Sequence, residues 1–148
     1  MKKPDSRTRE RGSAMVETAI TIPLLLMMMV GIFEVGRAYE TWQVLTNAAR
    51  EGARMAVTPS STEEITTALI RQYMADGQLV NSATATVVVD KTSTIDAGGT
   101  PVSASLVTVD YPFEFIMLQP VVRLVAPGAT VGGPLTMRAT SIMRNEAP

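Results

Sequence analysis

The chain has 148 residues, of which 13 are basic and 14 acidic, so its formal net charge at pH 7 is -1. This balance lacks the basic excess typical of nucleic-acid-binding proteins. The length allows one membrane helix and one small domain rather than two sizeable cores. Cysteine and histidine are both absent, which excludes disulfides and removes the commonest metal ligand and general base. We therefore expect no enzymatic activity, no metal or other cofactor, and no nucleic-acid partner.

The charges are unevenly distributed along the chain. Residues 1–12 contain five basic and two acidic side chains, a net charge of +3, whereas the remainder contains eight basic and twelve acidic side chains, a net charge of -4. Lys and Arg that flank a membrane helix tend to stay on its cytoplasmic side. This bias predicts a basic cytoplasmic leader over residues 1–12 and an extracytoplasmic C-terminal domain.

A long apolar segment follows the leader. The 21 residues from Ser13 to Phe33 hold a single charged side chain, that of Glu17. A helix of about 20 apolar residues is long enough to cross the hydrocarbon core of a bilayer. We therefore predict a transmembrane helix over residues 13–36, which makes the chain a single-pass membrane protein.

The helical pattern continues beyond the apolar segment, and Thr58-Pro59 should end it. We expect an extramembrane continuation over residues 37–58, and a helix on the order of 65 Å long in all at 1.5 Å per residue. Small and apolar residues recur there every three or four positions, the period of an amphipathic helix: Ala38, Trp42, Leu45, Ala49, Ala53 and Ala56.

Small residues form a ridge on this continuation. Ala48, Gly52 and Ala56 are spaced by four and therefore lie on one side of the helix. Another backbone can approach closely over such residues, so we predict that the ridge takes part in helix packing. The charged run 50–54 is interpreted as the solvated face of the helix, with an inter-subunit ion-pair site as the alternative.

A second, shorter helix is predicted after the first. Ser61 and Glu64 have the spacing of a capping box, in which each side chain binds the other residue's backbone amide. Asp76-Gly77 is typical of a helix end, where glycine adopts the left-handed conformation. The apolar spacing predicts that the buried face of this helix carries Ile65, Ala68, Leu69 and Tyr73.

The rest of the chain is patterned for strands, so we predict an α+β domain over residues 59–148 with a small antiparallel sheet. A turn is expected at residues 96–101. The apolar segment 112–134 is expected either to cover the core or to contact a partner or the membrane surface. Three segments are rich in Thr and Val or alternate polar with apolar residues: 84–89, 102–111 and 135–144.

Glu17 needs its own explanation, because a carboxylate near the start of a membrane helix is costly unless it is solvated, paired or near the interface. It is either a first-turn acid in the headgroup region, favoured by the helix dipole, or part of a processing site. Cleavage after Gly12 would make Ser13 the new N-terminus and place Glu17 at position five. The carboxylate could then pair with the free amine of a neighbouring subunit.

Two other interpretations of the first 35 residues are an ordinary cleaved secretory signal and an uncleaved signal anchor. The apolar segment is longer than the 7 to 15 residues or so of a secretory signal. The uncleaved anchor fits every feature except the position of Glu17.

At this point the chain resembles type IV pilin-like precursors, whose leader ends in glycine and whose mature helix carries glutamate at position five. More narrowly, residues 9–57 resemble the TadE-like family of pseudopilins from tight-adherence (Tad/Flp) pilus systems. Beyond residue 60 the resemblance rests on the layout of one helix followed by strands. The matching motifs are Arg11-Gly12-Ser13-Ala14-Met15-Val16-Glu17, Pro23-Leu24-Leu25-Leu26, Gly31-Ile32-Phe33-Glu34-Val35-Gly36-Arg37 and Asn47-Ala48-Ala49-Arg50-Glu51-Gly52-Ala53-Arg54.

The resemblance implies cleavage of the Gly12-Ser13 bond by a prepilin peptidase and a role for Glu17 in assembly. It also implies a minor pseudopilin that helps to build or anchor an adhesion pilus or a related secretion machinery. The major pilins of these systems are small and usually follow the glutamate with tyrosine, whereas this chain has Thr18 and a large C-terminal domain. A minor role is therefore favoured.

The partners implied are the membrane, the peptidase, other pilins or pseudopilins and the pilus assembly platform, in a hetero-oligomer. The implied location is the bacterial inner (cytoplasmic) membrane, with the N-terminus in the cytoplasm, or the pilus after incorporation. The alternative function is an uncleaved, membrane-tethered domain in which residues 60–148 bind or sense a ligand.

Overall fold

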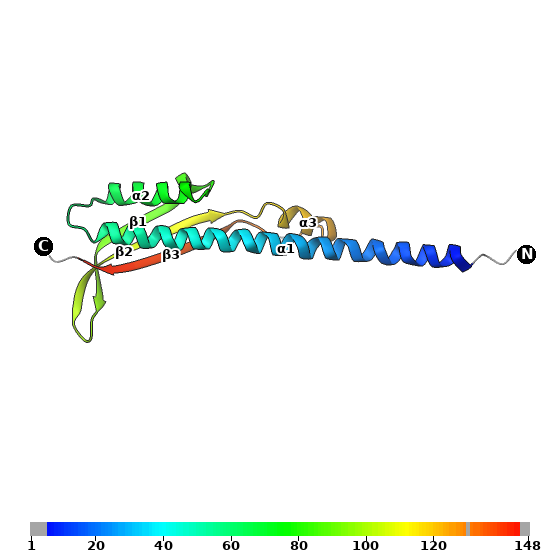
Figure 1. Cartoon of the computed structure of the whole chain (residues 1–148), viewed down its shortest axis with the longest axis horizontal. Coiled ribbons are helices and arrows are strands. Elements are labelled where there is room, and N and C mark those ends of the chain that lie inside the picture. Colours follow the sequence, from blue (N-terminus) through cyan, green and yellow to red (C-terminus); the bar gives the residue numbers. More distant parts are fainter. Residues whose placement is uncertain (1–5, 130, 146–148) are drawn as a thin grey trace, which may run out of the picture. The chain divides into compact units, whose positions relative to one another are not determined.

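The computed structural model describes residues 6–129 and 131–145, so residues 1–5 of the predicted leader lie outside the described part of the chain. Two compact units are present. The helical unit comprises residues 6–36 and 115–133, and the sheet unit comprises residues 37–114 and 134–145. The element order is α1 (Ser6–Ala56), α2 (Glu63–Asp76), the 3₁₀ helix η1 (Ser82–Thr84), β1 (Thr86–Asp96), β2 (Pro101–Phe113), α3 (Leu118–Val125) and β3 (Leu135–Arg144) (Figure 1).

The predicted α+β fold is confirmed, with a long apolar first helix, a short second helix and an antiparallel sheet. α1 begins at Ser6 and continues past Pro23 to Ala56. Two hydroxyl groups near this proline donate to carbonyl oxygens four residues earlier in the same helix. Thr18 Oγ1 lies 2.7 Å from the Ala14 oxygen, and Thr21 Oγ1 lies 2.8 Å from the Glu17 oxygen. Both hydroxyls are thereby satisfied within an apolar stretch.

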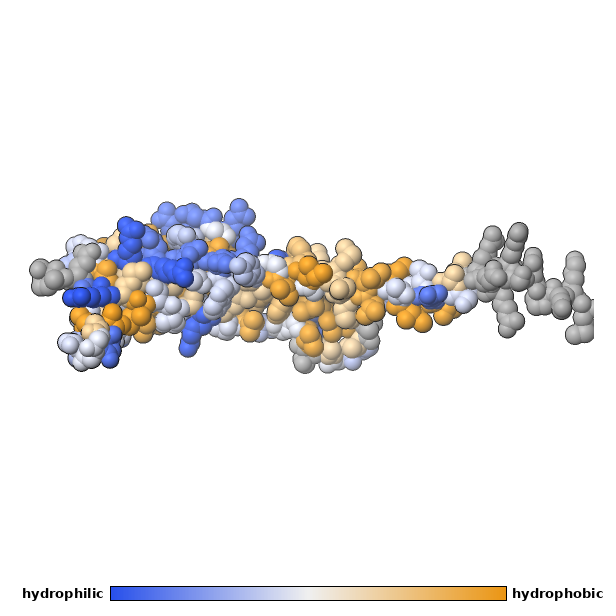
Figure 2. All heavy atoms as spheres, turned by 60° about the horizontal axis from the view of Figure 1, so that its bottom comes forward, coloured by the Kyte–Doolittle hydropathy of each residue, from blue (hydrophilic) through white to orange (hydrophobic). Residues whose placement is uncertain are grey.

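By length and composition, α1 is the one helix among the described residues that can cross a membrane, which indicates a single-pass membrane protein. From Ser13 to Phe33 it is apolar on nearly every side, as a helix surrounded by lipid should be. Figure 2 shows hydrophobic side chains gathered along this part of α1 and over α3. The large exposed side chains are Met15, Val16, Ile20, Ile22, Leu24, Leu25, Leu26, Met28, Met29, Ile32, Phe33 and Val35.

The sheet has three antiparallel strands in the order β1-β2-β3. β1 extends to Asp96, farther than the predicted segment 84–89, because a bulge between Asp90 and Ser93 shifts its register with β2. The Asp90 carboxylate accepts hydrogen bonds from the Thr92 amide, the Thr92 hydroxyl and the Ser93 hydroxyl at 2.8, 2.6 and 2.8 Å. These bonds stabilise the bulge, and those from Thr92 in particular hold the pKa of Asp90 below its ordinary value.

The N-terminus of α2 differs from the prediction. Thr62, rather than Ser61, is the capping residue, and its hydroxyl accepts a bond from the Ile65 amide at 3.3 Å. The Ser61 hydroxyl instead accepts a bond of 2.9 Å from the Lys91 ammonium group, which lies at the β1 bulge. The predicted capping box of Ser61 and Glu64 was therefore wrong, because the Ser61 hydroxyl binds Lys91 of the sheet.

The buried face of α2 was also predicted wrongly. Thr66, Ile70 and Met74 are buried. Of the residues predicted to be buried, Ile65 is 51% exposed, Ala68 and Tyr73 are exposed as well, and Leu69 is half-buried. A spacing of four between the buried residues gives a narrow stripe. The predicted residues form a different apolar stripe on α2, one position away from the stripe that is buried.

α2 ends at Asp76, with Gly77 as its C-terminal cap, as predicted, but the expected left-handed glycine is wrong. Gly77 has a φ of -77°, and the residue with the left-handed conformation is Gln78, at φ 60°. A Cβ atom on Gly77 would lie 2.6 Å from Val44 Cγ1 of α1. Glycine is therefore required at this position for close packing rather than for a turn.

Candidate assembly site on the N-terminal helix

Two of the residues predicted for processing and assembly lie on one side of α1. Ser13 and Glu17 are four residues apart and therefore occupy neighbouring positions one turn apart on the helix surface. Both are exposed, and a Cβ atom on Gly12 would meet no atom within 4 Å. This segment is accessible from outside the chain in its helical conformation.

The surroundings of Glu17 are apolar. Within the described residues its carboxylate has no hydrogen-bond or salt-bridge partner, and its neighbours along α1 are exposed and mostly apolar. A shallow groove of about 360 Å³ on the same helix is lined by Ala14, Met15, Thr18, Ala19 and Ile22. Ala14 and Ala19 are the smallest of these five residues, and Glu17 itself does not line the groove.

The small-residue ridge occupies a different environment. Ala48, Gly52 and Ala56 are all buried in the sheet unit. A Cβ atom on Gly52 would lie 2.4 Å from Ile70 Cδ1 of α2 and 3.4 Å from Val107 Cγ1 of β2. Within this chain the ridge is therefore the place where α1, α2 and β2 pack closely together.

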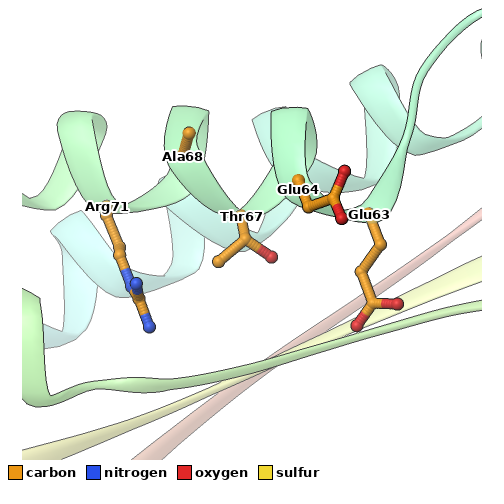
Figure 3. Close-up of a pocket in the computed structure, with 5 residues that line it drawn as sticks. All are labelled: Glu63, Glu64, Thr67, Ala68 and Arg71. Atoms are coloured by element: carbon orange, nitrogen blue, oxygen red, sulfur yellow. The ribbon is translucent and has the colours of Figure 1, made fainter.

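A polar groove of about 490 Å³ lies on α2 and is lined by Glu63, Glu64, Thr67, Ala68 and Arg71 (Figure 3). The side chains of Glu63, Thr67 and Arg71 project to the same side of the helix. The groove offers hydrogen-bonding groups of both charges. The described residues contain no cluster of three or more His, Cys, Asp or Glu side chains that could hold a metal ion.

Sequence reasoning missed the structural role of Glu34. This side chain is 1% exposed, and its Oε1 accepts hydrogen bonds from the Ile116 and Leu118 amides at 2.8 and 3.4 Å, and from the Met117 amide between them. The signal available in the sequence was a lone acidic residue at the end of an apolar segment. Its partners are more than 80 residues away, so no local pattern could identify them.

These features indicate a single-pass membrane protein whose long apolar helix continues into a small α+β domain and presents an accessible carboxylate near its start. Residues 12–54 match the family model described as TadE-like protein. The resemblance predicted from the sequence is thereby confirmed for this segment, which is consistent with a TadE-like protein of Tad pilus systems. No curated protein and no solved structure matches the chain.

Proposed function

We propose that the chain is a minor pseudopilin, a structural component in the assembly of a Tad/Flp adhesion pilus or the related secretion machinery. The observation that carries the proposal is the family match, because it begins at Gly12 and includes Ser13 and Glu17. It thus covers the accessible start of the membrane helix and the carboxylate one turn farther along.

Processing would take place at the bond between Gly12 and Ser13. A peptidase needs this segment to unwind, since the bond lies inside α1. Glycine favours unwinding, because it is about 1 kcal/mol less favourable than alanine in a helix interior. The absence of neighbouring atoms around Gly12 also supports access for a protease. The basic leader, retained on the cytoplasmic side, would set the side on which cleavage occurs.

Assembly would use Glu17 as an acceptor for a charge on a neighbouring subunit. Cleavage frees the Ser13 amine, and in an apolar setting an unpaired charge is destabilised by several kcal/mol. Pairing between the amine of one subunit and Glu17 of the next would remove this penalty for both groups. The exposure of Glu17 and of the apolar side chains around it supports contact with another helix.

The role in assembly can be tested with Glu17→Ala in a host that carries a Tad system. Cleavage should be preserved, whereas the amount of the variant in the sheared pilus and platform fractions should fall about tenfold, the equivalent of 1.4 kcal/mol of lost pairing energy. Glu40→Ala, another exposed acid on α1, serves as the control and should behave as wild type.

Normal incorporation of the Glu17 variant would contradict the role of that side chain. Absence of the wild-type protein from both fractions would contradict the pseudopilin function itself. That result would favour the uncleaved, membrane-tethered binding or sensing domain.

A further inference from the structure

The segment 115–133 of the helical unit has an unusual composition for a connection outside the membrane. Its 19 residues contain one charged side chain, that of Arg123. Ile116, Met117 and Val131 are 59%, 49% and 58% exposed. Exposed apolar side chains so close in the sequence mark an interaction surface.

This segment packs against the membrane-spanning part of α1. Within the described residues of α1 up to 36, Val30 and Glu34 are buried, and Met27 and Gly31 are half-buried. Their spacing of three and four places all of these residues on one face of the helix. The rest of the helical unit is formed by residues 115–133, which therefore cover that face (Figure 1).

The covered face lies at the end of the apolar segment of α1, with Met27, Val30 and Gly31 inside that segment and Glu34 directly after it. The 21 residues from Ser13 to Phe33 span about 31 Å, close to the ~30 Å thickness of a bilayer core. Val30 precedes Phe33 by three residues, so it lies about 5 Å inside that boundary. Elements that lie in the membrane interface reach about 5–10 Å into the boundary between headgroups and acyl chains.

The backbone of the segment is adapted to an apolar environment. An amide exposed to hydrocarbon without a partner is destabilising. The amides of Ile116 and Leu118, which precede and begin α3, both donate to Glu34. The Val121 and Ala126 amides donate to carbonyls within the segment at 3.2 and 2.8 Å. In a water-exposed turn, water could accept the hydrogen bonds of the Ile116 and Leu118 amides, so a buried carboxylate would not be required.

We infer that residues 115–133 lie in the membrane interface beside the end of the α1 span, and that Ile116, Met117 and Val131 insert among the lipid acyl chains. Arg123, which is exposed in the last turn of α3, can reach the phosphate groups of the lipids with its long side chain. The occupant of this surface is therefore the bilayer itself. The inference rests on α1 as a membrane span and does not depend on a role in pilus assembly.

The insertion can be tested with single-tryptophan variants of the full chain, in which Trp42 is replaced by Phe. Ile116→Trp and Val131→Trp report on the segment, Ile32→Trp on a lipid-facing position of α1, and Val80→Trp on a position that is 92% exposed in the sheet unit. The proteins are reconstituted into phosphatidylcholine and phosphatidylglycerol vesicles with or without brominated acyl chains, because bromine quenches tryptophan fluorescence on contact.

The expected result is quenching at positions 116 and 131 within about twofold of that at position 32, and clearly greater than that at position 80. Val131 is not among the residues that contact Glu34, so it reports on insertion even if the change at Ile116 disturbs α3. Quenching at 116 and 131 no stronger than at 80 would overturn the inference, whether water or another protein covers the segment. Loss of quenching at position 32 as well would overturn both the span and the inference.

Discussion

Glu34 gives the apolar half of α1 a specific attachment point for a distant part of the chain. Its buried carboxylate caps the N-terminus of α3, where unpaired amides carry a partial positive charge. A buried donor left without an acceptor costs about 1–3 kcal/mol. This side chain therefore contributes to holding α3 on α1.

Replacing Glu34 by Ala should release α3. The Ile116 and Leu118 amides would lose their acceptor, so we expect amide hydrogen exchange over residues 116–126 to accelerate about tenfold or more in phospholipid nanodiscs. Glu34→Gln retains a side-chain carbonyl oxygen and should have a smaller effect. Equal exchange rates in wild type and Glu34→Ala would show that the cap does not hold α3.

Gly132 and Gly128 offer a matched pair for testing the packing within the segment 115–133. Both have positive φ values, 85° and 95°, but only a Cβ atom on Gly132 would contact the chain, 2.9 Å from the Gln119 amide nitrogen. Alanine at either position should be destabilising by about 1–2 kcal/mol through its conformation. Gly132→Ala should be destabilising by about a further 1–3 kcal/mol through overpacking. Thermal unfolding of both variants measures their loss of stability, which should be larger for Gly132→Ala. A larger loss for Gly128→Ala would contradict the prediction.

At the scale of the elements, the packing of α1 against α2 depends on Gly52. A Cβ atom there would lie 2.4 Å from Ile70 Cδ1, so Gly52→Ala should be destabilising by about 1–3 kcal/mol in spite of the higher helix propensity of alanine. Gly36→Ala, where no atom lies within 4 Å, should be neutral or stabilising by up to about 1 kcal/mol.

Urea unfolding of the full chain in detergent compares the Gly52 and Gly36 variants. The double variant Gly52→Ala/Ile70→Ala should lose less stability than the sum of its two single changes, because the smaller Ile70 side chain removes the clash. Strict additivity would argue against direct packing of these two residues.

The pairing of β2 with β3 includes an ion pair between Asp110 and Arg138, with Arg138 Nε 2.7 Å from Asp110 Oδ1. The hydrogen bond from Arg138 lowers the pKa of Asp110 below its ordinary value of 3.8. A lowered pKa in the folded state gives stability that is present above the unfolded pKa and is lost as the pH falls through the folded pKa.

Because the Arg138 side chain is 68% exposed, Asp110→Asn should reduce stability at neutral pH by less than about 1 kcal/mol. The difference from wild type should shrink as the pH falls below 3.8. Urea unfolding at several pH values measures this difference in stability. A difference that grows in acid would contradict the stabilising role of the ion pair.

The sequence predicted those elements whose signals are local. The apolar segment and its amphipathic continuation identified α1, and Thr- and Val-rich alternation identified the strands. The prediction failed where distant residues decide the structure. Lys91 donates a hydrogen bond to the Ser61 hydroxyl, and Thr62 is the capping residue of α2 instead. α3 was not predicted at all, because Glu34 supplies its cap from a distant part of the sequence.

At the scale of the whole molecule, the candidate site rests on local sequence and stays a prediction, whereas the fold around it depends on distant contacts. Gly12, Ser13 and Glu17 lie within six consecutive residues, and the family match covers all of them. A processing site followed by a carboxylate is a property of sequence order, so it needs no tertiary structure to be recognised. The burial of Ala48, Gly52 and Ala56 within the chain's own sheet unit could not be foreseen in this way, because it depends on α2 and β2.

The central claim is that this chain is a prepilin-type substrate that becomes a pseudopilin. The most direct test is the N-terminal sequence and intact mass of the membrane-extracted protein, produced with and without a cognate prepilin peptidase. Gly12→Ile serves as the control, because a β-branched residue disfavours close entry into a protease site. We predict a start at Ser13 that requires both the peptidase and Gly12. A start at Met1 or Lys2 in the presence of active peptidase would contradict the account.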